Sequence, residues 1–532
     1  MCLLSRRLGP RSQLICVAWT ARLRTVKEGQ GGPAHLSNER ALLARVGELL
    51  AGRDVTAYLV GGWVRDRLLG RPTRDIDLTV AADGRDIARQ VADDLGASYV
   101  PLDEVNRIGR VVAGDWTFDL ATLQGNVEDD LARRDFTIDA IAVELSGWLK
   151  NPERLALIDP CRGADDLHHK LVRVVRDNAL AADPIRLLRG VRLAAQLGFA
   201  IEAGTEDLFR RDASLVARAA GERIREELLL LLTVPGSGRW LAYLDQLGQL
   251  TALFPEIAPT RGAPQPVLHQ WDVFEHSLQS VQALDFLLRE ANWALAPKEA
   301  LASAPWSSEV AAHFDSEVGH GSTHRTLLKL AALFHDIAKP QTMTTEADGR
   351  VRFLGHGEAG AAIVGGILAR LRFSVRETRL VETMVRHHMR PTQMGQPDTE
   401  MPSRRAVYRY LRDTGEAAID ILYLSLADHL ATRGPTLDLS DWQVHTGVVT
   451  HVLAQREPPG SAPPKLIDGH DIMVSFGVPP GPRLGEILEL VREAQAAGEV
   501  ASREEALALV RNALAEPSAG TPKLSEEEET GR

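Results

Sequence analysis

The chain has 532 residues, of which 44% are hydrophobic and 25% are charged, and its formal net charge is −11. This length is that of about three or four domains rather than one, and the composition is that of a soluble globular protein. No apolar run reaches the roughly 20 residues that cross a bilayer, so we predict no membrane span. The negative net charge does not exclude a nucleic-acid partner, because basic residues can still gather on one local surface.

The three cysteines, Cys2, Cys16 and Cys161, form neither a disulfide framework nor a thiolate metal motif. We therefore expect a reducing, cytoplasmic location. The first 27 residues contain arginine and lysine but no acid, which is also typical of an organellar transit peptide. An unstructured extension or an upstream translation start explains them equally well, and we expect residues 1–34 to be such an extension.

The stretch Tyr58–Val80 predicts a strand, a glycine turn, a short helix and a second strand that carries Asp75 and Asp77. Residues at positions i and i+2 of a strand point to the same face. The two carboxylates would therefore lie side by side and could hold Mg²⁺, which takes its remaining ligands from water and substrate phosphates.

Gly61 and Gly62 can bring backbone N–H groups close to a triphosphate, and Arg65 and Arg74 can add charge-assisted contacts. A surface Asp-x-Asp beside an ordinary glycine turn is the alternative. Taken together, the glycine turn, the arginine and the aspartate pair resemble the signature of the class II tRNA nucleotidyltransferase and poly(A) polymerase family, within the DNA polymerase β-like superfamily. The resemblance implies a multidomain, mainly α protein: an α+β nucleotidyltransferase head with a small mixed sheet, then a helical RNA-binding body. It also implies tRNA, CTP and ATP as partners.

Around this stretch we predict helices at His35–Leu50 and Ile87–Leu95, and strands at Arg110–Ala113 and Trp116–Leu120. Asp119 lies on the second of these strands between Phe118 and Leu120. It could be the third carboxylate that a two-metal site uses to align the attacking hydroxyl, or it could cap a turn.

The segment from Leu131 to Ala140 resembles the family's second motif. Its arginines, Arg133 and Arg134, could hold a ribose and phosphates, although such a pair is also common on a solvated surface. Asp139 stands where the family normally has Asn, so its contact is expected to differ. Residues 157–163 resemble the third motif, a structural hinge.

From Leu171 onward the pattern becomes helical. Pro184 predicts a helix start with Asp183 as its cap, and the arginines that follow are spaced by three. The resemblance to the fourth motif implies instead that Asp183 and Arg186 read the incoming base, because a carboxylate accepts from the amino group of C or A and a guanidinium donates to ring acceptors. Ala182 replaces the family's usual Glu, which alters the expected support of Arg186. Residues 221–228 resemble the fifth motif.

Only 15 positions separate Asp119 from Arg134 (134 minus 119). Relatives that add the whole CCA end carry a longer loop there, which takes part in switching from C to A. The short connection therefore resembles the members that add only the two cytidines.

Beyond a linker at Thr260–Gln270, five helical segments each carry a candidate metal ligand, in an order that resembles the HD phosphohydrolase superfamily. The six candidates are His276, His335, Asp336, His356, His388 and Asp428. Such a mixed set can bind a divalent transition metal or Mg²⁺. The resemblance implies hydrolysis of a phosphoester, by a phosphatase or a 2′,3′-cyclic phosphodiesterase, with Lys339 neutralising developing charge.

We expect the following domains: the extension 1–34, a nucleotidyltransferase head 35–175, a helical neck 176–260, an HD domain 261–435, a helical tail module 436–516 and a disordered tail 517–532. Residues 291–323 read as an inserted surface segment. The leading hypothesis is addition of C, and of A as an open alternative, to the tRNA 3′ end. Three other hypotheses stay open: a poly(A) polymerase, an RNA-binding module with a dead head, and an HD hydrolase whose head recruits RNA.

Overall fold

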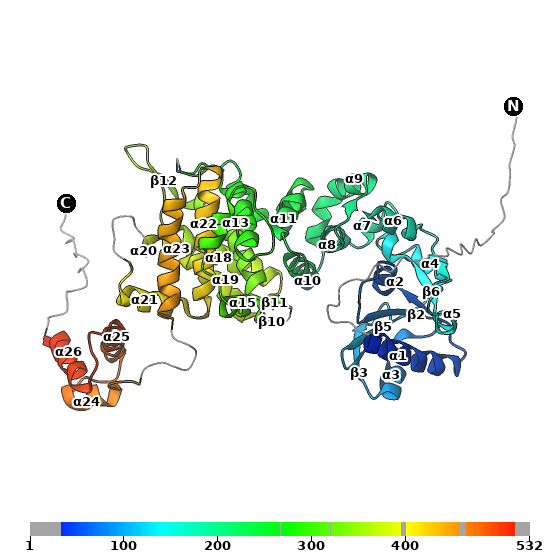
Figure 1. Ribbon diagram of the computed structural model, residues 1–532, viewed down its shortest axis with the longest axis horizontal. Helices are drawn as coiled ribbons and strands as arrows, with labels where there is room; N and C mark the ends of the chain where they lie inside the picture. Colours follow the sequence, from blue (N-terminus) through cyan, green and yellow to red (C-terminus); the bar gives the residue numbers. More distant parts are fainter. Residues whose placement is uncertain (1–32, 267, 320, 395–400, 457–463, 516–532) are drawn as a thin grey trace, which may run out of the picture. The chain divides into compact units, whose positions relative to one another are not determined.

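The computed structural model describes residues 33–266, 268–319, 321–394, 401–456 and 464–515 (Figure 1). The predicted tail 517–532 and nearly all of the predicted extension lie outside the described residues. The chain divides into two compact units, one within Met1–Val234 and Trp240–Pro255, the other within Pro235–Arg239 and Glu256–Arg532.

The first unit is built on a seven-stranded mixed sheet in the order β3-β4-β5-β2-β1-β6-β7. β2 and β5 pair in parallel, and every other pair in this sheet is antiparallel. The sheet confirms the predicted α+β head, although β3, β6 and β7 were not predicted. Its strands are β1 (Ala57–Val60), β2 (Asp75–Val80), β3 (Ser98–Asp103), β4 (Ile108–Ala113), β5 (Trp116–Thr122), β6 (Ala142–Glu144) and β7 (Leu157–Ile158).

Alternation along the two central strands separates a core face from a polar face. Ile76 and Leu78 of β2 and Phe118 and Leu120 of β5 are at most 1% exposed. Because successive side chains point to opposite faces, the residues between them are turned away from this core. The helices beside the sheet are α1 (Pro33–Ala51), α2 (Gly61–Leu68), α3 (Gly84–Leu95), α4 (Val127–Leu131), α5 (Leu145–Lys150) and α6 (Gly163–His169).

Helices continue the chain after the sheet, as predicted. They are α7 (Ala179–Ala182), α8 (Arg186–Leu197), α9 (Ala203–Asp212), α10 (Gly221–Leu232), α11 (Ser237–Gln246) and α12 (Gln249–Leu253), with a strand pair of β8 (Leu171–Val172) and β9 (Ala200–Ile201). The prediction that Asp183 caps a helix is wrong. Asp183 ends α7, and the residue before α8 is Ile185, which makes no side-chain cap hydrogen bond.

The second unit is a helical bundle in which α13 packs on α16 and α22, and α19 packs on α16 and α18 (Figure 1). The helices of the bundle and its surroundings are α13 (Val273–Leu287), α14 (Lys298–Ser303), α15 (Ser308–Asp315), α16 (His324–Phe334), α17 (Lys339–Thr342), α18 (His356–Arg370), α19 (Val375–His387), α20 (Arg390–Met394), α21 (Arg404–Thr414), α22 (Ala418–Arg433) and α23 (Leu439–Ala454). Two short hairpins, β10 (Glu317–Gly319) with β11 (Ser322–Thr323) and β12 (Met343–Thr345) with β13 (Val351–Phe353), complete it.

The segment 291–323, predicted as a surface insertion, is packed into this bundle. Phe314 is fully buried, and its ring contacts the ring of Tyr423 on α22 at a centroid distance of 4.9 Å. Aromatic residues in a segment rich in Ala and Ser therefore signal a buried face.

The last helices form a small core of their own. They are α24 (Gly469–Phe476), α25 (Pro482–Ala497) and α26 (Arg503–Ala515). Ile472, Ile487, Val491 and Val510 are buried together between them. In the part of the chain that the structure describes, no helix combines the length and the apolar character needed to cross a membrane.

Candidate active sites and RNA surface

Two aspartates face each other across the central parallel strands of the sheet. Asp77 of β2 lies in direct register with Asp119 of β5, and Asp75 lies opposite Thr117. All three predicted carboxylates therefore belong to one pair of strands; we call Asp75, Asp77 and Asp119 the carboxylate cluster. Asp75 is exposed, whereas Asp77 and Asp119 are half-buried.

The pKa of Asp77 is raised to about 6. Burial is the largest cause, Arg134 opposes it, and the neighbouring Asp119 and Asp139 add to it. The backbone N–H of Gly62 donates to Asp77 Oδ2 over 3.1 Å. A carboxylate that burial and like charges make costly to ionise gains most from a bound cation, so the cluster fits the divalent ion expected there.

The glycine turn is packed directly against this carboxylate. Gly61 has φ +64°, and a Cβ atom on it would lie 3.0 Å from Asp77 Oδ2 and 3.0 Å from Arg134 Nη1. Both the backbone conformation and the space require glycine. The turn opens α2, so N–H groups of its first turn lie next to the cluster, and that of Gly62 donates to Asp77.

Asp119 is held by a residue that the sequence analysis did not single out. Arg110 of β4 donates from Nε and Nη2 to the two oxygens of Asp119, over 2.7 and 2.8 Å. The two residues are direct partners in the antiparallel β4–β5 register. Asp119 therefore does not cap a turn.

Arg65 and Arg74 differ in their surroundings. Arg65 is largely buried and binds Asp66 over 3.0 Å and Asp139 Oδ1 over 2.7 Å. Asp139, which stands in place of the family's Asn, thus makes an ion pair. Arg74 is half-exposed at the start of β2 and pairs with Asp115 over 2.7 Å.

Arg133 and Arg134 also differ from each other in exposure and in their contacts. Arg134 lies beside Gly61, with Nη2 at 3.4 Å from Thr79 Oγ1 and 3.6 Å from Asp130. Arg133 is more exposed, donates to the carbonyl of Gln124 and lies 3.8 Å from Asp130.

Arg186 Nε lies 3.9 Å from Asp183 Oδ2, so the two side chains are close to each other, as the fourth motif implies. Both oxygens of Asp183 accept from Arg223 of α10, each over 2.8 Å. Arg186 donates to the carbonyls of Ala179, at 3.3 Å, and of Arg133, at 3.1 Å. Backbone carbonyls thus support Arg186 in a chain that has Ala182 where the family has Glu.

The other arginines of α8 converge on one buried acid. Arg189 and Arg192 bind the two oxygens of Glu227 over 2.7 and 2.6 Å, and Arg189 also lies 3.2 Å from Asp135. Glu227 is 5% exposed. It lies in the fifth motif, whose sequence gave no sign that it would face α8.

In the second unit, the six predicted ligands lie in one group, which we call the histidine cluster: His276, His335, Asp336, His356, His388 and Asp428. Asp336 lies between two subsets. Its Oδ2 is 3.2 Å from His335 Nε2 and 3.6 Å from His276 Nε2, and its Oδ1 is 3.6 Å from His356 Nε2 and 3.7 Å from His388 Nε2. Asp428 Oδ1 completes the first subset at 3.0 Å from His276 Nε2.

Burial sets the charges of this cluster. It lowers the pKa of His388 to about 3, so this imidazole is neutral and available as a ligand. Burial would raise the pKa of Asp336, but His335 and Lys339 outweigh it and hold that pKa well below its ordinary value. Lys339 Nζ lies 2.6 Å from Asp336 Oδ2. Imidazoles on both sides of a buried carboxylate fit two divalent ions that share Asp336.

A hollow of about 770 Å³ opens above the histidine cluster. His356 and Asp428 line it together with basic side chains, namely Lys339, Arg352, Arg386 and Arg433. His387 also lines it and is not a member of the cluster. His269 lies in the predicted linker, and its ring meets the ring of His276 edge-on at a centroid distance of 5.4 Å. The sequence did not identify His269 as part of the site, because nothing in the linker indicated that it folds over the metal ligands.

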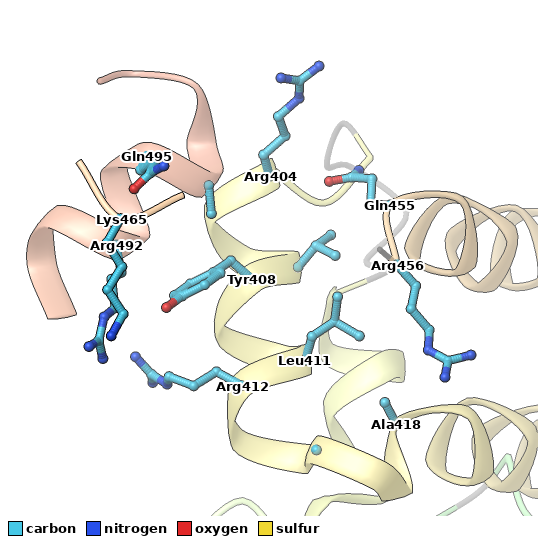
Figure 2. A pocket seen from close by; sticks show the side chains of 13 residues that line it. Arg404, Tyr408, Leu411, Arg412, Ala418, Gln455, Arg456, Lys465, Arg492 and Gln495 are labelled. Atoms are coloured by element: carbon cyan, nitrogen blue, oxygen red, sulfur yellow. The ribbon is translucent and has the colours of Figure 1, made fainter. Parts of the chain in front are cut away.

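A second hollow, of about 560 Å³, lies between α21, the end of α23 and α25 (Figure 2). Its charged lining is entirely basic: Arg404, Arg412, Arg456, Lys465 and Arg492. Tyr408 adds an aromatic face, and Glu489 beside the hollow binds Tyr408 and Arg412. A basic hollow with an aromatic ring is suited to a nucleic-acid backbone and an unstacked base.

Family models cover most of the chain. A poly A polymerase head domain matches residues 57–173, a probable RNA- and SrmB-binding site of polymerase A matches 198–260, an HD domain matches 273–433 and a putative second domain of tRNA nucleotidyltransferases matches 463–510.

The protein is similar to an A-adding tRNA nucleotidyltransferase of Deinococcus radiodurans, at 34% identity over 86% of this chain and 95% of the relative. It is equally similar to a CC-adding tRNA nucleotidyltransferase of Thermus thermophilus, at 34% over 88% and 96%. Its fold resembles a CCA-adding enzyme solved with ATP, with a TM-score of 0.59 at 21% identity, covering 91% of this chain and 96% of that one. A Thermotoga maritima CCA-adding enzyme in complex with tRNA gives a TM-score of 0.55 at 20% identity, covering 91% and 96%. The chain therefore belongs to the tRNA nucleotidyltransferase family, with an HD domain fused to its nucleotidyltransferase head.

Proposed function

We propose that the protein transfers CMP from CTP to the 3′-hydroxyl of tRNA and releases pyrophosphate. The direct opposition of Asp77 and Asp119 beside the Gly61–Gly62 turn carries this proposal. Membership of a family that includes CC-adding and A-adding enzymes supports it.

In the reaction, the 3′-hydroxyl gives up its proton to solvent and its oxygen forms a bond to the α-phosphorus. The bond from that phosphorus to the bridging oxygen breaks, and pyrophosphate leaves. Asp75, Asp77 and Asp119 would hold Mg²⁺, which supplies Lewis-acid stabilisation of the phosphoryl oxygens. Asp119, fixed by Arg110, orients the attacking hydroxyl. The N–H groups at Gly61 and Gly62 bind the triphosphate of the nucleotide.

Basic side chains around the glycine turn support nucleotide binding. Arg134 is adjacent to Gly61, and Arg133 precedes it in the turn that follows α4. Arg65 lies on α2 itself, and its ion pair with Asp139 holds its side chain in place. Arg74 is the outermost of the set and would exchange Asp115 for a phosphate.

Asp183 and Arg186 are proposed to choose the base. A carboxylate and a guanidinium together match the amino group and the ring acceptors of C and A, and they leave G and U poorly paired. Arg223 now occupies both oxygens of Asp183. Each carboxylate oxygen can accept a second hydrogen bond, so the base can bind Asp183 beside Arg223.

The short connection after Asp119 favours addition of C alone. β5 ends at Thr122 and α4 begins at Val127, so only Leu123–Asn126 join them. The test is to incubate the full chain with tRNA that ends at its discriminator base, with CTP, ATP or both. We expect two cytidines from CTP and no further product when ATP is added. A complete C-C-A end formed by this protein alone contradicts the restriction.

The same assay separates the other hypotheses. A long homopolymer from ATP alone indicates a poly(A) polymerase. No incorporation of labelled CTP, with tRNA bound, indicates an RNA-binding module with an inactive head.

The histidine cluster favours a second activity, the metal-dependent hydrolysis of a phosphomonoester or a 2′,3′-cyclic phosphate. The shared position of Asp336 between two histidine subsets carries this proposal. Replacing both His335 and Asp336 by Ala should abolish metal-dependent hydrolysis of a generic phosphoester and lower the metal content. His387→Ala is the matched control, since His387 lies at the hollow but outside the cluster, and should keep its metal. Unchanged metal content in the double variant contradicts the assignment.

The identity of the second metal and the cellular location belong to the same proposal. Imidazole-rich ligands favour a transition ion such as Mn²⁺, Co²⁺, Ni²⁺ or Fe²⁺ over Mg²⁺. Handling of tRNA ends is consistent with the cytoplasmic location inferred from the cysteines.

A further inference from the structure

A separate group of metal-ligating side chains lies in the second unit, outside the histidine cluster. It consists of His313 on α15, His324 at the first position of α16 and Asp420 on α22. Their ligand atoms all lie within 4.8 Å of one another. Asp420 is completely buried, and the side chains of His313 and His324 are 13% and 6% exposed.

Both imidazoles converge on a single oxygen. His313 Nε2 lies 3.0 Å and His324 Nδ1 lies 2.9 Å from Asp420 Oδ2. Asp420 Oδ1 is buried and, among the described residues, has no hydrogen-bond partner. Two imidazoles that only donate hydrogen bonds could use one oxygen each, and a buried carboxylate normally uses both. The arrangement therefore leaves a ligand atom unused.

The burial of Asp420 gives a second reason to expect a cation. Its carboxylate is completely buried, and within the described ranges no lysine or arginine forms an ion pair with it. A buried carboxylate is costly unless a positive partner neutralises it.

The donor set and its spacing match zinc. Two imidazoles and a carboxylate are common zinc ligands, and bonds of about 2.0–2.1 Å in a tetrahedron place ligand atoms roughly 3.3 Å apart. The observed separations of 2.9 and 3.0 Å from Oδ2 need to widen by only a few tenths of an ångström. A water molecule would be the fourth ligand, beside His313, the most exposed of the three side chains.

We propose that His313, His324 and Asp420 bind one Zn²⁺ ion, which joins the segment 291–323 to α16 and α22. The role is structural. α15, which carries His313, reaches α22 otherwise through aromatic packing, where Phe314 contacts Tyr423. The ion would link α15 to α16 and α22. α22 carries Asp428 of the histidine cluster, and α16 ends directly before His335.

The test uses the full chain with His335→Ala and Asp336→Ala, which reduces binding at the histidine cluster. In this background we compare His313→Gln and His324→Gln with His470→Gln, an exposed control in the same unit. Glutamine keeps a hydrogen-bond donor toward Asp420 but is a poor zinc ligand. Zinc content after dialysis, and the melting temperature with and without a chelator, are measured for each protein.

We expect the background and the His470→Gln control to keep one more equivalent of zinc than His313→Gln or His324→Gln. The chelator should lower the melting temperature of the first two proteins and leave the other two unchanged. Equal zinc content and an equal response to the chelator in all four proteins overturn the proposal, and the trio is then a hydrogen-bonded network only.

A spectroscopic readout covers the case in which a variant does not fold. Co²⁺ in a tetrahedral site absorbs strongly in the visible region, and it can be added to the folded background protein alone. We expect such absorption, displaced by one equivalent of Zn²⁺. A background protein with no tetrahedral Co²⁺ signal also overturns the proposal.

Discussion

Gly61 shows how one residue is fixed by two separate constraints. Its φ of +64° and its close approach to Asp77 and Arg134 both exclude a side chain. Gly61→Ala should therefore lower the free energy of unfolding by about 1–2 kcal/mol from backbone strain. It should also lower kcat for CMP incorporation by about 100-fold, because the new methyl group displaces Asp77.

Gly70→Ala is the matched control. Gly70 has nearly the same φ, +66°, but a Cβ on it meets nothing within 4 Å. It should share the stability loss and keep kcat. Equal losses of kcat in both variants would mean that strain, and not contact with Asp77, limits the reaction.

Asp77 links the active site to pH. Its folded-state pKa of about 6 lies above the ordinary value of 3.8, so the folded state favours the protonated form. In the metal-free protein, Asp77 therefore does not reduce the free energy of unfolding below its unfolded-state pKa. It reduces that free energy as the pH rises through the folded-state pKa. Asp77→Asn should stabilise the metal-free protein by about 1–3 kcal/mol at about pH 8, with the gain vanishing near pH 4.

The measurement is thermal unfolding across this pH range, with and without Mg²⁺. Mg²⁺ should stabilise the wild type at neutral pH and have little effect on Asp77→Asn. If the variant and the wild type had the same melting temperature at every pH, burial of the ionised Asp77 carboxylate would not destabilise the protein.

At the scale of elements, the β4–β5 hairpin shows which contacts can be predicted from the sequence. The strands at Arg110–Ala113 and Trp116–Leu120 were predicted from their alternation, and a two-residue connection between them sets the register. Pairing Ala113 with Trp116 places Arg110 opposite Asp119 by counting alone. The partner of Asp119 could therefore have been found in the sequence.

The contacts between helices could not be found in this way. Asp183 and Arg223 are 40 positions apart, and their pairing depends on how α10 packs against the α7–α8 segment. Periodicity identifies a helix and its buried face, but it does not say which neighbour covers that face. Only the family resemblance gave Asp183 and Arg186 a shared role and assembled the histidine cluster.

Glu227 provides a prediction at this scale. It is buried between Arg189 and Arg192 of α8, so its removal leaves two guanidinium groups without their shared partner. Glu227→Ala should destabilise the first unit by about 3–5 kcal/mol. Glu226→Ala, at the adjacent position of α10, is the control and should cost far less. Thermal unfolding of both variants checks this, and equal melting temperatures would show that the shared partner is dispensable.

The basic hollow of α21 and α25 allows a prediction about RNA. Arg456 and Lys465 both line it. Replacing both by Glu should raise KM for tRNA without changing KM for CTP, and should reduce the salt dependence of tRNA binding. Lys298→Glu, at an exposed residue elsewhere in the second unit, shows the effect of reversing one positive charge outside the hollow. An unchanged KM for tRNA would exclude the hollow as an RNA surface.

At the scale of the whole molecule, the two clusters belong to different compact units, each with its own core. Their chemistry should therefore separate. Asp77→Asn should abolish CMP incorporation and leave phosphoester hydrolysis at its wild-type rate, and the His335→Ala and Asp336→Ala double variant should do the reverse. Both activities are measured on the same protein preparations, with the same tRNA present.

The result also tests the hypothesis that hydrolysis is the main activity and the head only recruits RNA. In that case Asp77→Asn would keep every measurable activity, because binding of tRNA does not require the carboxylate. Loss of incorporation with retained hydrolysis instead assigns one reaction to each unit. If either variant reduced both activities, the two units would be functionally coupled. The variant with both His335→Ala and Asp336→Ala would then lower kcat for CMP incorporation and leave KM for CTP unchanged. The reason is that no residue of the histidine cluster contacts the nucleotide in this proposal.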